Sequence, residues 1–286
     1  MKKIIVHPGR AHRDDFLSTC IALSTTNEYP IIERREPTEQ ELDDKDILIL
    51  DIGMRHEPAK RNFDHHQRSR KDSPKCALTL LIEDLNLESI FKYQNWYEVT
   101  AKIDVLGPKL TAEQMGLDKF PHQLSSPIES SLLRIFGNLE SIPPDSTIYQ
   151  IMDSIGHDIV TQAKKYKERI QFLLLELEKR DNTQLSIIDI GFDLRGFLVL
   201  DKEVEGLGYI RDHFYEKIDF LVAHNDRGKG WTLYRYDDNQ KIDFSQIEND
   251  ERIQFAHKNG FIAKTKEMIS RKEIIQLLQL SRIKND

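Results

Sequence analysis

Short apolar runs alternate with helical patterns through the first half of this 286-residue chain, and this alternation constrains its fold more than any other feature. Ile4–Val6 and Asp46–Leu50 have the length and apolar content of buried strands. Asp14–Leu23 and Ala77–Leu85 carry apolar residues at helical spacing instead. Strands and helices that follow one another in this order predict an α/β fold.

The pattern changes after Pro143-Pro144. From Ile148 to about Arg180 there is no proline, and only Gly156 interrupts a helical sequence of roughly 30 residues, which would be about 45 Å long. A helix of this length is too long for the interior of a small domain, so we interpret it as a connector. Strands are predicted beyond it, followed by a terminal helix at Arg271–Ser281. We expect a first domain at 1–140, a helical connector at 141–182 and a smaller C-terminal domain at 183–286.

The charge of the chain bears on its partners. A net charge of −7 argues against an extended, sequence-independent grip on nucleic acid. Basic residues gather in the segments Lys60–Lys75 and Lys264–Lys272, although solvated surface charge is the simpler explanation of either cluster taken alone.

The two cysteines and the hydropathy of the chain indicate a compartment. Cys20 and Cys76 lie in apolar helical patterns without CxxC spacing, so we expect reduced thiols. No apolar run approaches the roughly 18 residues that a membrane span needs. The residues around Ile4–Val6 do not form a signal peptide either. We therefore expect a cytoplasmic protein without a membrane partner.

Imidazoles and carboxylates come directly after three of the predicted strands. In an open α/β sheet the carboxyl ends of the strands form one rim where ligands bind, so these side chains are expected to meet. A mixed histidine and carboxylate cluster suits Mn²⁺, Fe²⁺ or Zn²⁺. Two such ions can share a carboxylate, activate a bridging water and hold a phosphoryl oxygen. The residues concerned are His7, His12, Asp14, Asp15, Asp51, Asp64, His65 and His66.

Each of these residues has a simpler explanation when taken alone. A single histidine at a strand end, such as His7, is more often a hydrogen-bonded structural residue, and a single aspartate, such as Asp51, is usually a turn former. The explanation weakens for the whole set, because four of the ten histidines lie within the first 66 residues beside the strand-terminal acids. The sequence thus predicts a metal-dependent phosphoesterase.

Several motifs form a set that can be compared with known families. They are His7-Pro8-Gly9, His12-Arg13-Asp14-Asp15, Asp51-Ile52-Gly53, Phe63-Asp64-His65-His66-Gln67 and Phe255–Ile262. This set resembles the Myg-type exonuclease family of the DHH phosphoesterase superfamily. The chain departs from that family at Ala11, where an aromatic residue is usual, at Asp15, where glutamate is usual, and at Ala263-Lys264, which replace a glycine pair.

The resemblance implies an N-terminal DHH-type metal-binding catalytic domain with a mostly parallel sheet, a long helical connector and a smaller α/β C-terminal domain that binds substrate. It implies that Asp51 bridges the ions, and that Asp64 and His66 orient the ligands or contact a phosphate. For the reaction itself, we hypothesise that His66 or Asp15 protonates the leaving oxygen. The implied metal ligands are His7, His12, Asp14, Asp51, His65 and Asp104, the last from Lys102-Ile103-Asp104-Val105. The resemblance implies that His257 contacts a substrate phosphate, and we expect Arg68 and Lys264 to neutralise phosphates as well.

The resulting hypothesis is an exonuclease for short RNA or DNA strands that uses two metal ions and a bridging hydroxide. Two Mn²⁺ ions are expected, with Mg²⁺, Fe²⁺ or Zn²⁺ as alternatives, and the partner is a single-stranded nucleic acid. Trp231 or Phe261 could stack on a base, although burial in the core is the favoured interpretation. Two other functions stay open: a phosphatase, pyrophosphatase or dinucleotide phosphodiesterase of the same superfamily, and an inactive metal-binding scaffold. A homodimer is also left open.

Overall fold

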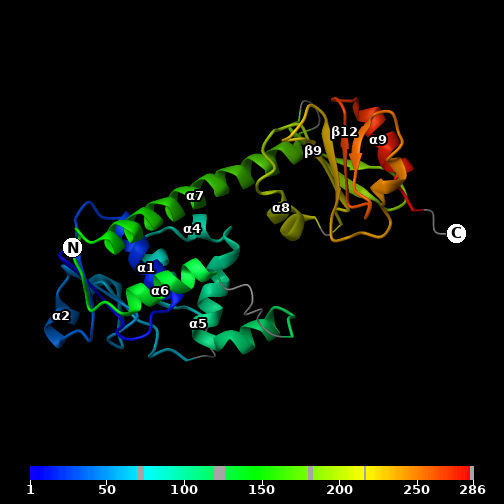
Figure 1. The fold of residues 1–286 in the computed structure, drawn as a ribbon. Coiled ribbons are helices and arrows are strands. Elements are labelled where there is room, and N and C mark those ends of the chain that lie inside the picture. The colour runs from blue at the N-terminus through cyan, green and yellow to red at the C-terminus, as the bar shows by residue number, and fades with distance from the viewer. Residues whose placement is uncertain (70–73, 119–125, 180–182, 216, 284–286) are drawn as a thin grey trace. The chain divides into compact units, whose positions relative to one another are not determined.

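The computed structural model describes residues 1–69, 74–118, 126–179, 183–215 and 217–283. The chain folds into two compact units, Met1–Lys165 and Tyr166–Asp286 (Figure 1). The boundary between them falls within the 32-residue helix α7 (Thr147–Glu178), which covers most of the helix predicted from the sequence. Each unit contains a mixed six-stranded sheet, so the predicted α/β fold is confirmed.

The first sheet has the strand order β4-β5-β3-β1-β2-β6. Its four inner strands are parallel to one another, while the two edge strands are antiparallel to their neighbours. The strands are β1 (Lys3–Val6), β2 (Ile31–Arg34), β3 (Ile47–Leu50), β4 (His56–Glu57), β5 (Asn62–Phe63) and β6 (Ser141–Ile142). Because β1 pairs with β2 on one side and with β3 on the other, the direction of winding reverses at β1. The carboxyl ends of strands at such a reversal point are where ligands bind in open α/β sheets.

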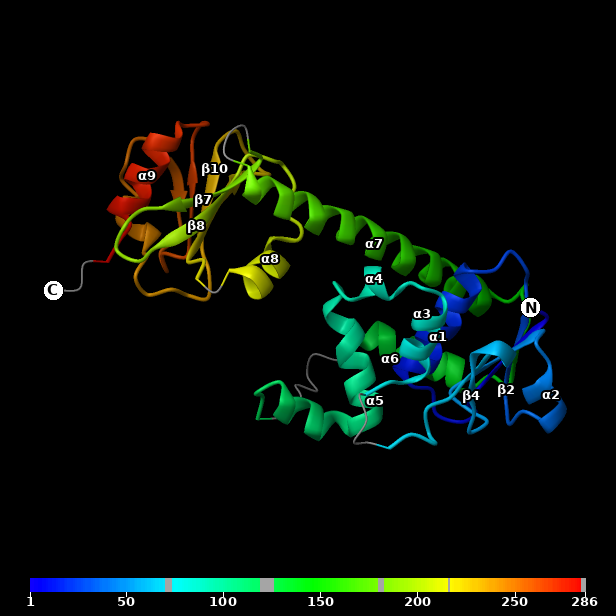
Figure 2. The ribbon, with the colours of Figure 1, turned by 180° about the vertical axis from the view of Figure 1, so that it is seen from behind.

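Alternating side chains divide this sheet between two layers. Ile4 and Val6 point into the larger core, which also contains residues of α1 (Arg13–Ser24), α3 (Ala77–Asp84), α6 (Pro127–Gly137) and α7. Ile5 points to the opposite face, where it packs with Ile49 and with Leu42 of the short helix α2 (Glu39–Asp43). Figure 2 shows α2 and α1 on opposite sides of the sheet. The period of two is that of a strand buried on both faces.

Two further helices complete the first unit. They are α4 (Glu88–Phe91) and α5 (Asn95–Gln114). A kink divides α5 at Gly107, whose φ of 81° lies outside the helical range, and Pro108 follows it. Glycine adopts this backbone conformation without a steric penalty, and proline cannot donate the next helical hydrogen bond. Asp104 therefore sits in the last turn before the kink.

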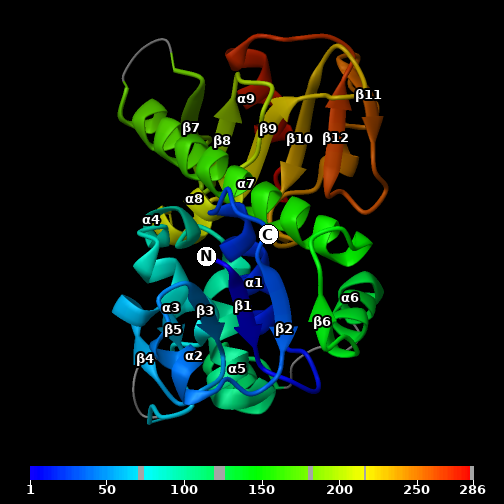
Figure 3. The same cartoon turned by 90° about the vertical axis from the view of Figure 1, so that its left-hand side faces the viewer.

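The second unit is a sheet of order β11-β12-β10-β9-β8-β7, whose strands lie side by side in Figure 3. Only the pairing of β8 with β9 is parallel among those described. The helices are α8 (Leu207–Phe214) and α9 (Arg271–Leu280), and α9 packs on one face of the sheet. The strands are β7 (Leu185–Asp189), β8 (Arg195–Val199), β9 (Phe220–His224), β10 (Trp231–Arg235), β11 (Ile253–Ala256) and β12 (Ile262–Thr265).

Trp231 lies in the core of this unit. Its side chain is buried, and the indole N–H donates a hydrogen bond of 3.0 Å to the carbonyl of Ile269. The structure thus supports the core interpretation over base stacking for this residue.

Other predictions concern membranes, cysteines and segments of uncertain placement. In the part of the chain that the structure describes, no helix is both long and apolar enough to cross a bilayer. Cys20 and Cys76 are buried free thiols, and burial raises the pKa of both. The basic residues Arg70 and Lys71, and the predicted domain boundary at 182, lie outside the described residues.

Candidate metal centre

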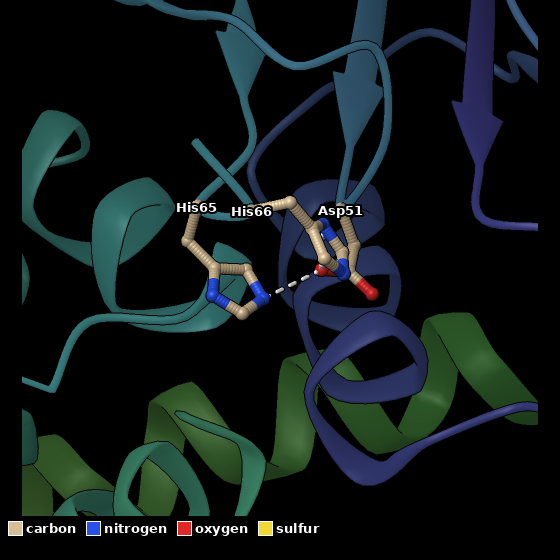
Figure 4. A group of neighbouring side chains, drawn as sticks. All are labelled: Asp51, His65 and His66. Atoms are coloured by element: carbon tan, nitrogen blue, oxygen red, sulfur yellow. Dashed lines mark ion pairs between the residues drawn. The ribbon is translucent and has the colours of Figure 1, made fainter. Parts of the chain in front are cut away.

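Three loops at the carboxyl ends of parallel strands bring the predicted residues together. His7 follows β1, Asp51 follows β3, and Asp64 follows β5. Figure 4 shows the side chain of Asp51, on the loop after β3, facing His65 and His66, which lie on the loop after β5. The side chains meet because the strands run parallel and end at one edge of the sheet, as expected from the sequence.

His65 lies at the middle of this group. Its Nε2 is 3.0 Å from Oδ1 of Asp51 and 3.0 Å from Oδ2 of Asp104. Asp104 also approaches the first loop, because its Oδ1 is 3.8 Å from Nδ1 of His12. The last turn of α5 before the Gly107 kink therefore supplies a fourth segment to the site.

Each of the six predicted metal ligands belongs to at least one group of three residues that could hold an ion. The donor atoms of each of four groups lie within 4.8 Å of one another, and Asp51 belongs to three of these groups. The groups are Asp51 with His65 and His66; His7 with Asp15 and Asp51; His12 with Asp14 and Asp51; and Asp14 with His65 and Asp104. A carboxylate shared among several donor sets suits a pair of ions.

Buried polar atoms without partners test whether the residues fit metal ions. Both carboxylate oxygens of Asp14 are buried, and neither has a hydrogen-bond partner among the described residues. Nδ1 of His7 is likewise buried and without a partner in the described structure. Leaving buried polar groups unsatisfied costs about 1–3 kcal/mol each. Oxygen and imidazole donors left free in one place are the chemistry of a divalent metal site, so the residues fit.

Asp64 holds His66 in place. Oδ1 of Asp64 lies 2.7 Å from Nδ1 of His66 and accepts a hydrogen bond of 3.0 Å from its backbone N–H. Oδ2 accepts a hydrogen bond of 2.6 Å from the backbone N–H of Met54. These contacts leave Nε2 as the free nitrogen of His66, whose side chain is about half exposed at 47%.

A buried arginine that the sequence did not single out holds the loop between β1 and α1. The guanidinium of Arg34 donates to the carbonyls of His7 at 2.7 Å and Gly9 at 3.0 Å. It lies 3.4 Å from Oδ2 of Asp15, whose Oδ1 accepts from the backbone N–H of His12. Asp15 is fully buried in this network. The only signal in the sequence was a charged residue at the end of an apolar strand.

Asp51 occupies a strained backbone conformation. Its φ is 59°, in the left-handed region that most side chains avoid. Aspartate and asparagine tolerate this region better than other residues, although strain at functional sites costs of order 1–3 kcal/mol. The backbone N–H of Asp51 donates 3.0 Å to the carbonyl of Phe63, which fixes the turn against β5. The conformation directs the carboxylate to the centre of the site.

Close packing of acids shapes the protonation of the site. Burial raises the pKa of Asp14, and the carboxylates of Asp51 and Asp104 raise it further. Burial also raises the pKa of Asp15, to about 8, although Arg34 opposes the shift. Without an ion, like charges at this density disfavour full ionisation, and a bound cation would remove that penalty.

His65 shows the opposite behaviour. Burial lowers its pKa, but the carboxylates of Asp104 and Asp51 outweigh this effect and raise the pKa to about 10. In the metal-free protein, the His65 imidazolium thus supplies the positive charge between Asp51 and Asp104. The pKa of Asp104 is lowered by the same pairing. Burial raises this pKa, but the hydrogen bond and charge of His65 outweigh burial and bring it below the usual value.

This arrangement predicts that metal binding releases a proton from His65. At neutral pH His65 is protonated in the free protein, and an ion must displace that proton, so affinity should rise about tenfold per pH unit between pH 6 and 9. Titration calorimetry with Mn²⁺ in buffers of different ionisation enthalpy measures the protons released. We expect at least about one at pH 7.5, and about one fewer in His65→Ala. Release near zero in the intact protein would show that His65 is no ligand.

The predicted substrate contacts lie on both units. Arg68 is exposed and follows the Asp64–His66 triplet. His257 lies at the turn between β11 and β12, where its Nδ1 accepts a hydrogen bond of 3.1 Å from the backbone N–H of Asn259. Its Nε2 is therefore the nitrogen that carries a proton. Lys264 lies on β12, opposite Thr232 of β10, and is partly exposed.

Comparison with known proteins gives a family match at the N-terminus. Residues 3–79 match the model of the MYG1 exonuclease family, which is described as an uncharacterised protein family (UPF0160). The matched segment contains the first four of the five motifs and all the predicted ligands except Asp104. No curated protein matches the chain.

Two solved structures are similar to the chain at a low level. An uncharacterised protein from Helicobacter pylori G27 is 13% identical, with 98% of this chain and 99% of that chain covered, at a TM-score of 0.24. RecJ of Thermus thermophilus, solved in complex with Mn²⁺, is 15% identical at a TM-score of 0.26. That match covers 97% of this chain, which spans about half, 51%, of the RecJ chain. TM-scores this low do not establish a shared fold.

Proposed function

We propose that this chain is a metal-dependent phosphodiesterase that acts as an exonuclease on short single strands of RNA or DNA. The observation that carries the proposal is the sharing of Asp51 among three sets of histidine and carboxylate donors at the switch point of a mainly parallel sheet. The match of residues 3–79 to the MYG1 exonuclease model supports it.

The proposal assigns two divalent ions, Mn²⁺ foremost, to the donors. His7, His12, Asp14, His65 and Asp104 would hold the two ions between them, with Asp51 shared. When bound, such ions polarise a phosphoryl oxygen and lower the pKa of a water that serves as nucleophile. The protein contributes a fixed set of donors, because Arg34 and the turn at Asp51 hold their loops before the ions arrive.

His66 is the residue that we propose as proton donor to the leaving oxygen. A hydrogen bond to Asp64 raises the pKa of His66, which favours the imidazolium form that a proton donor needs. Its half-exposed ring can meet a substrate, whereas the carboxylate of Asp15 is buried and occupied by His12 and Arg34. The proposal therefore gives Asp15 the role of fixing the first loop, and proton transfer rests with His66.

Substrate binding is assigned to exposed groups on each unit. Arg68 would neutralise a phosphate beside the Asp64–His66 triplet. On the second unit, the free Nε2–H of His257 and the ammonium of Lys264 would each bind a phosphate oxygen. Phe261, whose ring centroid lies 4.3 Å from that of His257, is partly exposed and would stack on a base.

A comparison of substrates tests the proposed reaction. The Mn²⁺-loaded protein is incubated in parallel with a 5′-labelled single-stranded oligonucleotide, with a dinucleotide and with pyrophosphate. We expect mononucleotides from the oligonucleotide, at a rate at least about a hundredfold greater than phosphate release from pyrophosphate. His56→Ala is the matched control, because His56 is exposed on the edge strand β4 and belongs to none of the four metal-capable groups. It should act like the intact protein.

Two results would contradict the proposal. Hydrolysis of pyrophosphate or of the dinucleotide without shortening of longer strands would assign the site to small phosphoesters. Bound metal without turnover of any of the three substrates would favour a scaffold.

A further inference from the structure

A hollow outside the metal centre borders the loop between β1 and α1, which carries His7 and His12 at its ends. It has a volume of about 710 Å³ and is lined by the middle of this loop and by the last turns of α6. The lining residues are Gly9, Arg10, Ala11, Ser130, Leu133, Arg134, Gly137 and Asn138. None of them is among the proposed metal ligands.

The polar side chains that line this hollow carry positive charge or none. Two of the eight lining residues are arginines, and none is acidic. Arg10 is exposed and makes no ion pair or side-chain hydrogen bond within the described residues, while Arg134 donates only to the hydroxyl of Ser131 at 3.0 Å. The acid nearest in sequence on α6, Glu129, is already paired with Arg13. The two guanidinium groups are therefore free to bind an anion.

The backbone of the loop offers further donors. Within the described residues, the N–H groups of Gly9, Arg10 and Ala11 have no hydrogen-bond partner. Gly9 has a φ of 77°, which turns successive N–H groups, and Ala11 is buried. Gly9 and Arg10 are exposed, so the pairing rule for buried backbone donors applies to Ala11 alone. Successive N–H groups at a turn can form an anion-binding concavity, which makes this loop a second source of donors beside the arginines.

Small residues let the loop pack closely on α6 beside the hollow. A Cβ atom added at Gly137 would lie 3.2 Å from the backbone nitrogen of Ala11 and 3.4 Å from the carbonyl oxygen of Gly9. The alanine side chain itself is only a methyl group. Arg34 fixes both walls, because its Nη1 donates to the carbonyls of Gly9 and of Phe136, next to Gly137.

We infer that this hollow is a phosphate-binding subsite, in which Arg10, Arg134 and the N–H groups of the loop take a phosphate of the nucleic-acid strand other than the one being cleaved. Guanidinium groups bind phosphate through paired N–H donors, and here they flank a loop whose two ends carry metal ligands. The inference rests on the proposed function for the identity of the strand. Such a subsite would also explain how a chain of net negative charge can bind a polyanion, because its two arginines place positive charge beside the metal centre.

The test measures binding without turnover. A fluorescently labelled, single-stranded pentanucleotide is titrated with protein in EDTA at several salt concentrations, and its anisotropy is followed. We expect Arg134→Gln and Arg10→Gln each to weaken binding about three- to tenfold at low salt, and each to reduce the slope of log K against log salt by about 0.7. Lys45→Gln is the control. It removes one exposed positive charge just before β3, at the opposite end of the sheet, and should bind within about twofold of the intact protein.

A second measurement separates this inference from the proposed function. With Mn²⁺ present, the ratio of kcat/KM for a tetranucleotide to that for a single phosphodiester should fall at least about tenfold in the double variant. An intact protein that hydrolyses neither substrate would remove the proposed function, whereas the EDTA titration would still report on the subsite. Equal affinities and equal salt slopes for intact protein, Arg10→Gln and Arg134→Gln, or no binding by the intact protein at low salt, would overturn the subsite.

Discussion

Replacing Asp51 by asparagine should abolish hydrolysis and at the same time leave the metal-free protein folded, with a stability close to that of the parent. Activity should fall about a thousandfold or more, because Asp51 belongs to three of the four donor groups and its charge is the one that both ions would share. Asparagine has the same shape and also tolerates the left-handed backbone at this position, where φ is 59°. The loss of activity would therefore result from the missing negative charge and not from unfolding of the variant.

The stability part of this prediction follows from two opposing charge effects. Burial and the charges of Asp51 and Asp104 raise the pKa of Asp14, so removing the charge of Asp51 relieves repulsion in the absence of metal. The substitution also removes an attraction to the imidazolium of His65, whose Nε2 is 3.0 Å from Oδ1 of Asp51. Metal analysis, oligonucleotide cleavage and thermal unfolding in EDTA measure the three quantities. Asp84→Asn, which changes an exposed acid of α3 outside the site, is the matched control and should keep full activity. A stable Asp51→Asn variant that still binds two ions and cleaves strands would contradict the assignment of Asp51.

Gly156→Ala should destabilise the first unit by about 3 kcal/mol or more. Helix propensity alone predicts the opposite sign, since alanine is better than glycine inside a helix by about 1 kcal/mol. In the structure, however, a Cβ atom at Gly156 would lie 1.9 Å from the backbone oxygen of Cys20. Backbone cannot move aside as a flexible side chain can, so α7 would have to separate from α1, and the packing between them would be lost. Urea unfolding measures the change.

Gly208→Ala, in a different helix, supplies the matched comparison for Gly156→Ala. Gly208 lies near the start of α8, and a Cβ atom added there would meet nothing within 4 Å. Only the propensity term remains, and this variant should be as stable as the parent or more stable by up to about 1 kcal/mol. If Gly156→Ala behaved like Gly208→Ala, the close approach of α7 to α1 would be wrong.

The sequence predicted the framework of the site well because that framework depends on local patterns. Apolar runs of three and four residues specified β1 and β3, and the residues directly after them became the rim of the sheet. Parallel pairing then brought His7 and Asp51 together without any further information. Asp104 was harder to assign, since it comes from a helix; its position depends on the Gly107 kink in α5 and on the approach to His65.

Features that depend on tertiary contacts were not predicted. Arg34 looked like an ordinary charged strand end, and only the folded chain shows its guanidinium under the first loop, bonded to carbonyls far apart in sequence. The interruption at Gly156 was noticed, but its cause, the backbone of Cys20, comes from another helix. Helices α6 and α8 were also absent from the sequence-based assignment.

The measurement that tests the central claim most directly is the cleavage of a 5′-labelled single-stranded oligonucleotide by metal-stripped protein, before and after addition of Mn²⁺. His65→Ala and Asp51→Asn are assayed in parallel. The account predicts no cleavage in EDTA, stepwise shortening to mononucleotides once Mn²⁺ is added, and loss of shortening in both variants. Equal cleavage with and without metal, or full activity in either variant, would contradict it.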